Sequence, residues 1–184
     1  MNWTRSAFLQ SIALSGPAMA LALKNGNNEN LQIDELVEIW HFSEEMALDF
    51  AEIMPEKYYE HRPVDYDGLY SYGGQMLHIG HNITGLISNY VTDDDPPELP
   101  ESAEELSKEE VITAMKSAFD FGEEAIQNQT RDSLFEEVPF FAEPLPRWHV
   151  LFIAQDHTTH HLGQAVIYLR SKGIVPPRYR KWES

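Results

Sequence analysis

The chain has 184 residues, 42% of them hydrophobic, which suits one globular domain with a sizeable core. It carries 30 Asp and Glu against 13 Lys and Arg, and the formal net charge of -17 argues against nucleic acid and anionic lipid as partners. There is no cysteine, which excludes disulfides and thiolate nucleophiles, so any bound metal must rely on His, Asp or Glu.

Residues 1–23 resemble an export signal peptide. The run from Ser6 to Leu23 is uncharged, and small residues near its end offer an A-x-A-like cleavage site at Ala18–Ala20 or Ala20–Ala22. Polar residues, a glycine and a proline interrupt the run, so we expect no stable membrane anchor. The predicted location is therefore periplasmic or extracellular, with residues 24–30 as a polar leader. The alternative is a cytoplasmic protein whose N-terminal helix packs on the domain.

Four later segments have apolar residues at helical spacing. We expect helices over residues 31–54, from about 74 to 91, from 108 to 126 and from about 146 to 172. The third follows a capping-box pattern that starts at Ser107, and the fourth is closed by a glycine and two prolines. No segment has the alternation of a strand ladder. The sequence therefore predicts an all-α four-helix bundle over residues 31–184, with two long connections.

The last predicted helix contains three histidines within five positions. On an ideal helix His157 and His161 share the face that points into the bundle, and His160 lies at the margin of that face. A buried imidazole needs a hydrogen-bond partner or a metal. Spacing alone leaves both open, and it does not decide whether His160 or His161 is the partner of His157.

A catalytic metal site usually has three protein ligands and one open position, so a third ligand must come from elsewhere. His78 lies about 130° from the centre of the apolar stripe of its helix, and periodicity therefore does not select it. The residues that remain open as the third ligand are His41, His61, His78, His81 and His149.

Two motifs resemble the DinB/YfiT-like family of bacterial proteins. They are "GQMLHIGHNI" at residues 74–83 and "DHTTHHLGQAVIYLRSKGIVPP" at residues 156–177, and "EIMPEKYYEHRP" resembles the turn between the first two helices of that family. The resemblance implies a four-helix bundle in which His78, His157 and His161 bind a divalent metal. His81 and His160 then become neighbours of the site. Leu162 departs from the arginine often found at its position, which weakens the transfer of substrate contacts.

The resemblance implies a metal-dependent hydrolase or a thiol S-transferase acting on a small molecule that the sequence does not identify. Three imidazoles suit Zn²⁺, Ni²⁺, Fe²⁺ or Mn²⁺. The alternative is a bundle that binds metal without catalysis, and a homodimer is compatible with the family. Residues that would orient the ligands or line the pocket are Trp40, His41, Asp156, Gln164 and Tyr168.

Overall fold

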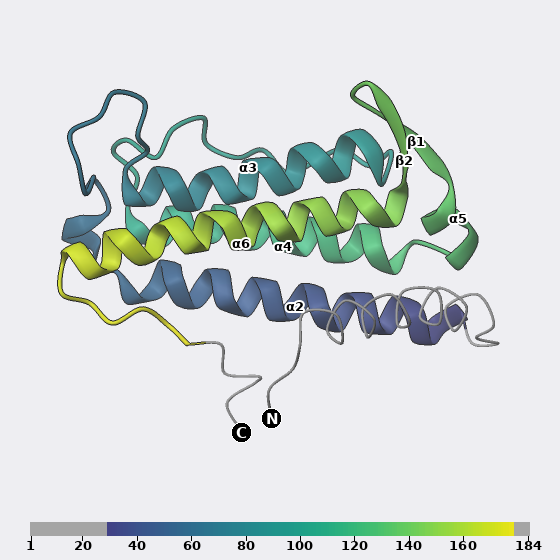
Figure 1. The fold of residues 1–184 in the computed structure, drawn as a ribbon, viewed down its shortest axis with the longest axis horizontal. Coiled ribbons are helices and arrows are strands. Elements are labelled where there is room, and N and C mark those ends of the chain that lie inside the picture. The colour runs from purple at the N-terminus through teal and green to yellow at the C-terminus, as the bar shows by residue number, and fades with distance from the viewer. Residues whose placement is uncertain (1–28, 179–184) are drawn as a thin grey trace, which may run out of the picture.

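A computed structural model describes residues 29–178 as a bundle of four long helices (Figure 1). These are α2 (Glu29–Ile53), α3 (Tyr72–Tyr90), α4 (Lys108–Gln127) and α6 (Arg147–Ser171). Around the bundle the neighbours follow the order α2, α4, α3, α6. The predicted all-α four-helix bundle is confirmed. Within residues 29–178, no helix is both long enough and apolar enough to cross a membrane.

The predicted export signal, residues 1–23, lies outside the described part of the chain, as do residues 24–28 of the predicted leader. Helix α2 begins at Glu29, two residues before the predicted start of the first helix. The short 3₁₀ helix η1 (Glu56–Tyr58) follows the end of α2.

The helix ends carry the local signals that the sequence contains. Ser107 and Glu110 form the predicted capping box at the start of α4. Ser71 caps α3 by accepting a hydrogen bond from the Gly74 backbone N–H, so this helix begins two residues earlier than expected. After α6, Gly173 adopts φ +72°, a conformation that glycine takes without strain.

The four apolar stripes meet in one core. Trp40 is buried at its centre, donates its indole N–H to the carbonyl of Phe119 at 2.9 Å, and packs edge-on against the Phe119 ring. Its ring fills the space beside Gly122 on α4, where a Cβ would lie 2.1 Å from the Trp40 ring. Other fully buried side chains come from α3, α4 and α6 and from Met54 just after α2: Met54, Met76, Ile79, Ile83, Met115, Ile126 and Leu169.

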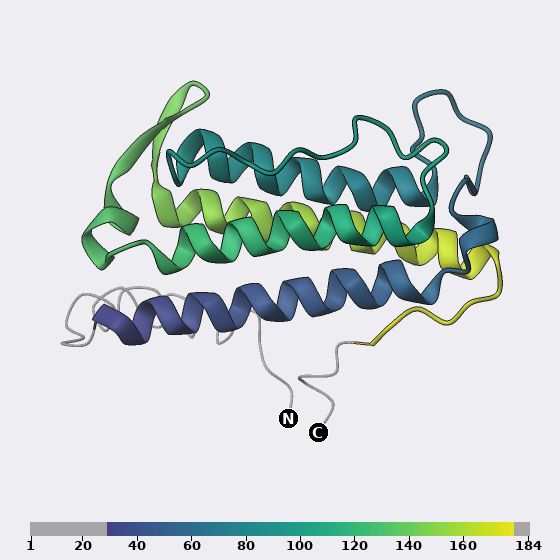
Figure 2. The same ribbon diagram turned by 180° about the vertical axis from the view of Figure 1, so that it is seen from behind.

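The connection between α3 and α4 runs back along the bundle, so these two helices point the same way (Figures 1 and 2). His81 donates from Nε2 to the carbonyl of Pro100 at 2.8 Å, and the Leu99 side chain lies against Gly80. The connection therefore covers the outer face of α3 in the half that contains the histidines.

The prolines at positions 139, 144 and 146 predict a loop over residues 128–147, and this prediction is wrong. These residues contain a short helix, α5 (Arg131–Phe135), and an antiparallel hairpin of β1 (Glu137–Phe140) and β2 (Glu143–Pro146). Pro139 pairs with Pro144 in the hairpin register. A two-stranded hairpin has only edge strands, so the missing N–H of a proline can face outward. The prolines that suggested a loop are thus compatible with strands here.

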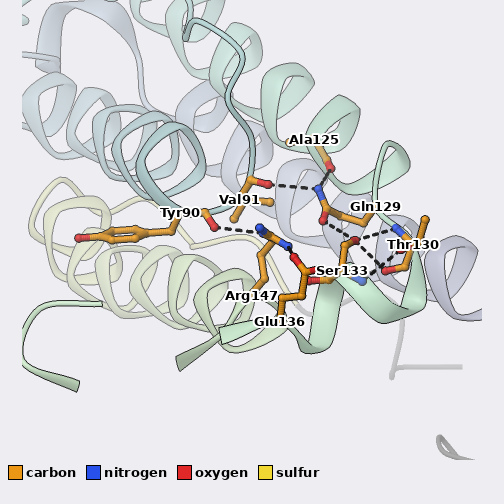
Figure 3. Close-up of polar contacts among 8 residues, drawn as sticks. All are labelled: Tyr90, Val91, Ala125, Gln129, Thr130, Ser133, Glu136 and Arg147. Atoms are coloured by element: carbon orange, nitrogen blue, oxygen red, sulfur yellow. Dashed lines mark hydrogen bonds and ion pairs between the residues drawn. The ribbon is translucent and has the colours of Figure 1, made fainter. Parts of the chain in front are cut away.

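Arg147 joins this hairpin end of the bundle to the start of α6 (Figure 3). Its guanidinium donates to the carbonyl of Ser133 at 2.6 Å and pairs with Glu136 at 3.1 Å. Its Nε donates to the carbonyl of Tyr90, the last residue of α3, at 3.3 Å. These contacts fix where α6 begins relative to the end of α3.

We predict that Gly122→Ala destabilises the protein by about 1–3 kcal/mol, because the new methyl group must displace the Trp40 ring. This loss should exceed the gain of about 1 kcal/mol that alanine normally gives over glycine within a helix. Urea unfolding measures the effect. Gly85→Ala on α3 is the matched control, since nothing lies within 4 Å of its Cβ, and it should stabilise the protein. Equal effects of the two substitutions would contradict the packing account.

Candidate metal centre

Helices α3 and α6 lie side by side and run in opposite directions. At the far end from the hairpin, the Tyr168 hydroxyl donates to the carbonyl of Tyr70, just before α3, at 2.8 Å. This register brings His78, in the second turn of α3, opposite His157 and His161 on α6. The latter two are four residues apart and so project from the same side of their helix.

The three predicted ligand residues come together, each offering one nitrogen within 4.8 Å of the others. The Nε2 atoms of His157 and His161 are 3.1 Å apart, and the His78 ring centre lies 5.1 and 4.6 Å from those two ring centres. Two imidazole nitrogens on one tetrahedral zinc ion would be about 3.3 Å apart at Zn–N distances of about 2.0–2.1 Å. The spacing of the His157–His161 pair therefore suits one ion, with His78 as a third ligand within reach, and the ligand role stays a prediction.

Burial and mutual proximity keep these imidazoles neutral. The pKa of His161 is lowered to about 4, first by burial and then by the nearby His157 and His78. Burial likewise lowers the pKa of His157 to about 4, helped by His78 and opposed by Asp156. The pKa of His78 is lowered too, first by burial and then by His81. Neutral imidazoles have the free lone pairs that a metal requires.

The second ring nitrogen of His161 contacts a residue that the sequence did not single out. Gln75 is 1% exposed, and its Nε2 lies 2.5 Å from His161 Nδ1 and donates to Gln164 Oε1 at 2.8 Å. Gln164 was predicted to lie near the site, and it does. Gln75 had a signal in its spacing, since three residues before His78 is the same side of α3.

Two buried side-chain atoms within residues 29–178 have no hydrogen-bond partner: His157 Nδ1 and Asn82 Oδ1. Asn82 follows His78 by one helical turn and so projects from the same side of α3. Buried polar atoms without partners are costly, on the order of 1–3 kcal/mol each. Their presence beside the triad marks this region as one not arranged for stability alone.

His160 and His81 lie beside the group, outside the triad. His160 is exposed, and its Nε2 is 2.7 Å from Gln164 Nε2. The His81 ring is held by the Pro100 carbonyl. The structure thus places His161, and not His160, beside His157 and His78, a choice that spacing alone left open.

The other residues considered from the sequence lie elsewhere. His41 is on α2 and pairs with Glu123 of α4 at 2.9 Å, while Trp40 belongs to the core. His61 contacts the Ser171 hydroxyl at 2.7 Å. The ring of His149 stacks on its neighbour Trp148, and Asp156 is exposed. Tyr168 donates to the Tyr70 carbonyl and so helps to hold α6 against α3.

A second group with metal-like spacing consists of His41, Glu44 and Glu123. Lys116 lies 3.6 Å from Glu44 and already supplies a positive charge there, and His41 is largely exposed. Exposed ion pairs of this kind are common and contribute little, so we read the group as a surface network between α2 and α4.

A cleft of about 750 Å³ adjoins the triad and has His78 in its wall. It lies between the segment before α3 and the connection after it, and Tyr70 stacks on the His78 ring with centres 5.0 Å apart. Its charged residues are one cation, Arg62, and four acids: Asp65, Asp67, Glu101 and Glu104. The Arg62 Nε donates to the carbonyl of Leu69, so this side chain also holds the segment.

Comparison with known proteins gives a consistent result. The model of the DinB family matches residues 24–182. The crystal structure of a DinB-like protein from Bacillus cereus superposes with a TM-score of 0.67 at 19% identity, covering 79% of this chain and 95% of that one. At this identity the structural match shows the fold alone. No curated protein matches significantly.

The lowered pKa values predict how stability depends on pH. Between pH 6.5 and about 4 the unfolded chain binds protons at these histidines that the folded chain excludes. The two histidines therefore lower the free energy of unfolding increasingly as the pH falls through that window, and they have no such effect above pH 6.5. Urea unfolding at pH 6.5 and 4.5 should therefore show a smaller loss of stability for His157→Gln/His161→Gln than for the wild type. His149→Gln is the control. Parallel losses in the wild type and the double variant would contradict the assignment.

Proposed function

The chain belongs to the DinB family, and on that premise we propose that His78, His157 and His161 hold one divalent transition-metal ion that serves the hydrolysis of small molecules. The observation that carries the proposal is the convergence of three neutral imidazoles from two helices beside a cleft that shares His78. Nitrogen donors of this kind suit Zn²⁺, Ni²⁺, Fe²⁺ or Mn²⁺.

A bound ion with an open position would lower the pKa of a water molecule and so supply a nucleophile near neutral pH. The protein would contribute ligands that need no net loss of a proton, since burial keeps His157 and His161 neutral down to about pH 4. Tyr70 packs on one face of the His78 ring and would restrict its rotation. A substrate in the cleft would lie against His78.

The charge of the cleft favours hydrolysis over thiol transfer. Four carboxylates face one arginine, so the cleft opposes anions, and this includes thiol cosubstrates that carry carboxylate groups. A neutral or cationic substrate attacked by water avoids that repulsion. A bundle that binds metal without turnover is the remaining alternative, and it makes the same metal-binding predictions without the activity.

We predict about one zinc ion per chain after loading and desalting, measured by elemental analysis. His157→Ala should lose it, because two nitrogens alone rarely retain zinc against dialysis. His160→Ala should keep it, as should His149→Ala. Metal retained by His157→Ala, or a wild type that binds none, would overturn the ligand assignment.

We predict that the zinc-loaded protein hydrolyses cationic and neutral p-nitrophenyl esters faster than an anionic ester of the same length. The expected difference in kcat/KM between the cationic and the anionic ester is on the order of 10-fold, and it should shrink in high salt. The double variant Asp65→Asn/Glu101→Gln should reduce this difference in kcat/KM, while Asp132→Asn on α5 should leave it unchanged. Preference for the anionic ester contradicts the charge argument. If zinc binds and no ester reacts, a second assay separates the two alternatives. Conjugation of thiols to 1-chloro-2,4-dinitrobenzene by the zinc-loaded protein would favour a thiol transferase. No conjugation would favour a bundle that binds metal without catalysis.

A further inference from the structure

A continuous chain of polar contacts leads from the triad to the surface between α3 and α6. It starts at Nδ1 of His161, passes through the buried Gln75 amide at 2.5 Å and the Gln164 amide at 2.8 Å, and ends at Nε2 of His160 at 2.7 Å. His160 is exposed, whereas Gln75 is 1% exposed. The chain thus connects a buried ring to a solvent-exposed one.

The direction of these hydrogen bonds fixes where the protons lie. The Gln75 amide nitrogen has two protons, and it donates one to Gln164 Oε1 and the other to His161 Nδ1. His161 must then carry its own proton on Nε2, which points at Nε2 of His157 at 3.1 Å. His157 accepts there and has its proton on Nδ1, the buried atom without a partner.

This arrangement cannot bind a metal as it stands, because a ligand nitrogen needs its lone pair. For His161 to bind through Nε2, its proton must move to Nδ1, and Nδ1 then needs an acceptor. A half-turn of the Gln75 amide would present Oε1 in that place. Gln164 must then turn as well to donate to that oxygen, and its own Oε1 would face His160 Nε2, which must become a donor.

We propose that Gln75 and Gln164 form a two-position amide relay that couples the tautomer of His161 to that of His160. Gln75 is a positioning residue in this relay. One orientation of the amides holds His161 in the tautomer that hydrogen-bonds to His157, and the other holds it in the tautomer that binds a metal through Nε2. The inference rests on the proposed metal site, and it assigns to Gln75 a share of the metal affinity.

Two substitutions at Gln75 should shift zinc affinity in opposite directions. Gln75→Glu can only accept from Nδ1–H, so it should fix the metal-binding tautomer and tighten zinc binding. Gln75→Leu removes the acceptor and should weaken binding about 10- to 100-fold. Competition with a chromophoric chelator measures both affinities. Gln155→Glu adds the same charge on α6 and should leave the affinity near that of the wild type.

The tautomers themselves provide a readout that needs no metal. In ¹⁵N-labelled, metal-free protein, the His161 ring should show the Nε2–H form in the wild type and the Nδ1–H form in Gln75→Glu. Adding zinc to the wild type should convert His160 to its Nε2–H form, and Gln164→Leu should abolish that conversion.

The relay is overturned if both Gln75 variants lower zinc affinity in parallel with their melting temperatures, or if His161 has the Nδ1–H tautomer in the metal-free wild type. Failure of the metal proposal looks different. In that case the wild type binds no zinc through His157, yet the ring tautomers of the metal-free protein still follow the Gln75 substitutions.

Discussion

The antiparallel contact between α3 and α6 is the constraint on which the site depends. Contacts at both ends hold it: Arg147 reaches the carbonyl of Tyr90 at one end, and Tyr168 reaches that of Tyr70 at the other. A shift of one residue would turn a side chain by about 100° around its helix and move it about 1.5 Å along the axis. The convergence of three imidazoles from two helices could not survive such a shift. Helix α5 matters to the site because Ser133 in it and Glu136 just after it hold Arg147 in place.

The site places three polar imidazoles inside an otherwise apolar bundle. Its buried histidines lose hydration, and this loss is what lowers their pKa values and keeps the rings neutral. The same neutrality leaves nitrogen lone pairs for a metal. His157 Nδ1 is buried there without a hydrogen-bond partner. Charge is placed outside, where four carboxylates surround the cleft next to His78. A chain with a formal net charge of -17 attracts cations and repels anions at long range, and the cleft has the same sign as the whole.

The sequence predicted the parts that depend on local periodicity. The bundle follows from apolar stripes, and the capping box at Ser107 marked the start of α4. The four-residue spacing placed His157 and His161 on one side of α6. It could not rank His160 against His161, because on an ideal helix they lie on either side of His157, at about 60° and about 40° from it. His78 is off the apolar stripe of α3, so only family resemblance selected it before the structure brought it to the other two.

Other features could not be found from local patterns. Gln75 resembles a polar interruption of α3 until its long-range contact to α6 is known, 86 residues away. The hairpin was hidden by Pro139 and Pro144, which normally argue against strands and are accommodated here because both strands are edges. The Gln75 contact joins segments far apart in the chain, which a sequence pattern does not record. The hairpin pairs neighbouring segments, and it was missed because its prolines argue against strands.

The central claim is that His78, His157 and His161 surround one metal ion. X-ray absorption at the zinc edge, on protein loaded with one equivalent of zinc, tests it most directly. The account predicts about three imidazole nitrogens and one oxygen at about 2.0 Å, with one imidazole lost in His161→Ala. A shell of carboxylate oxygens, or an unchanged imidazole count in that variant, would contradict it.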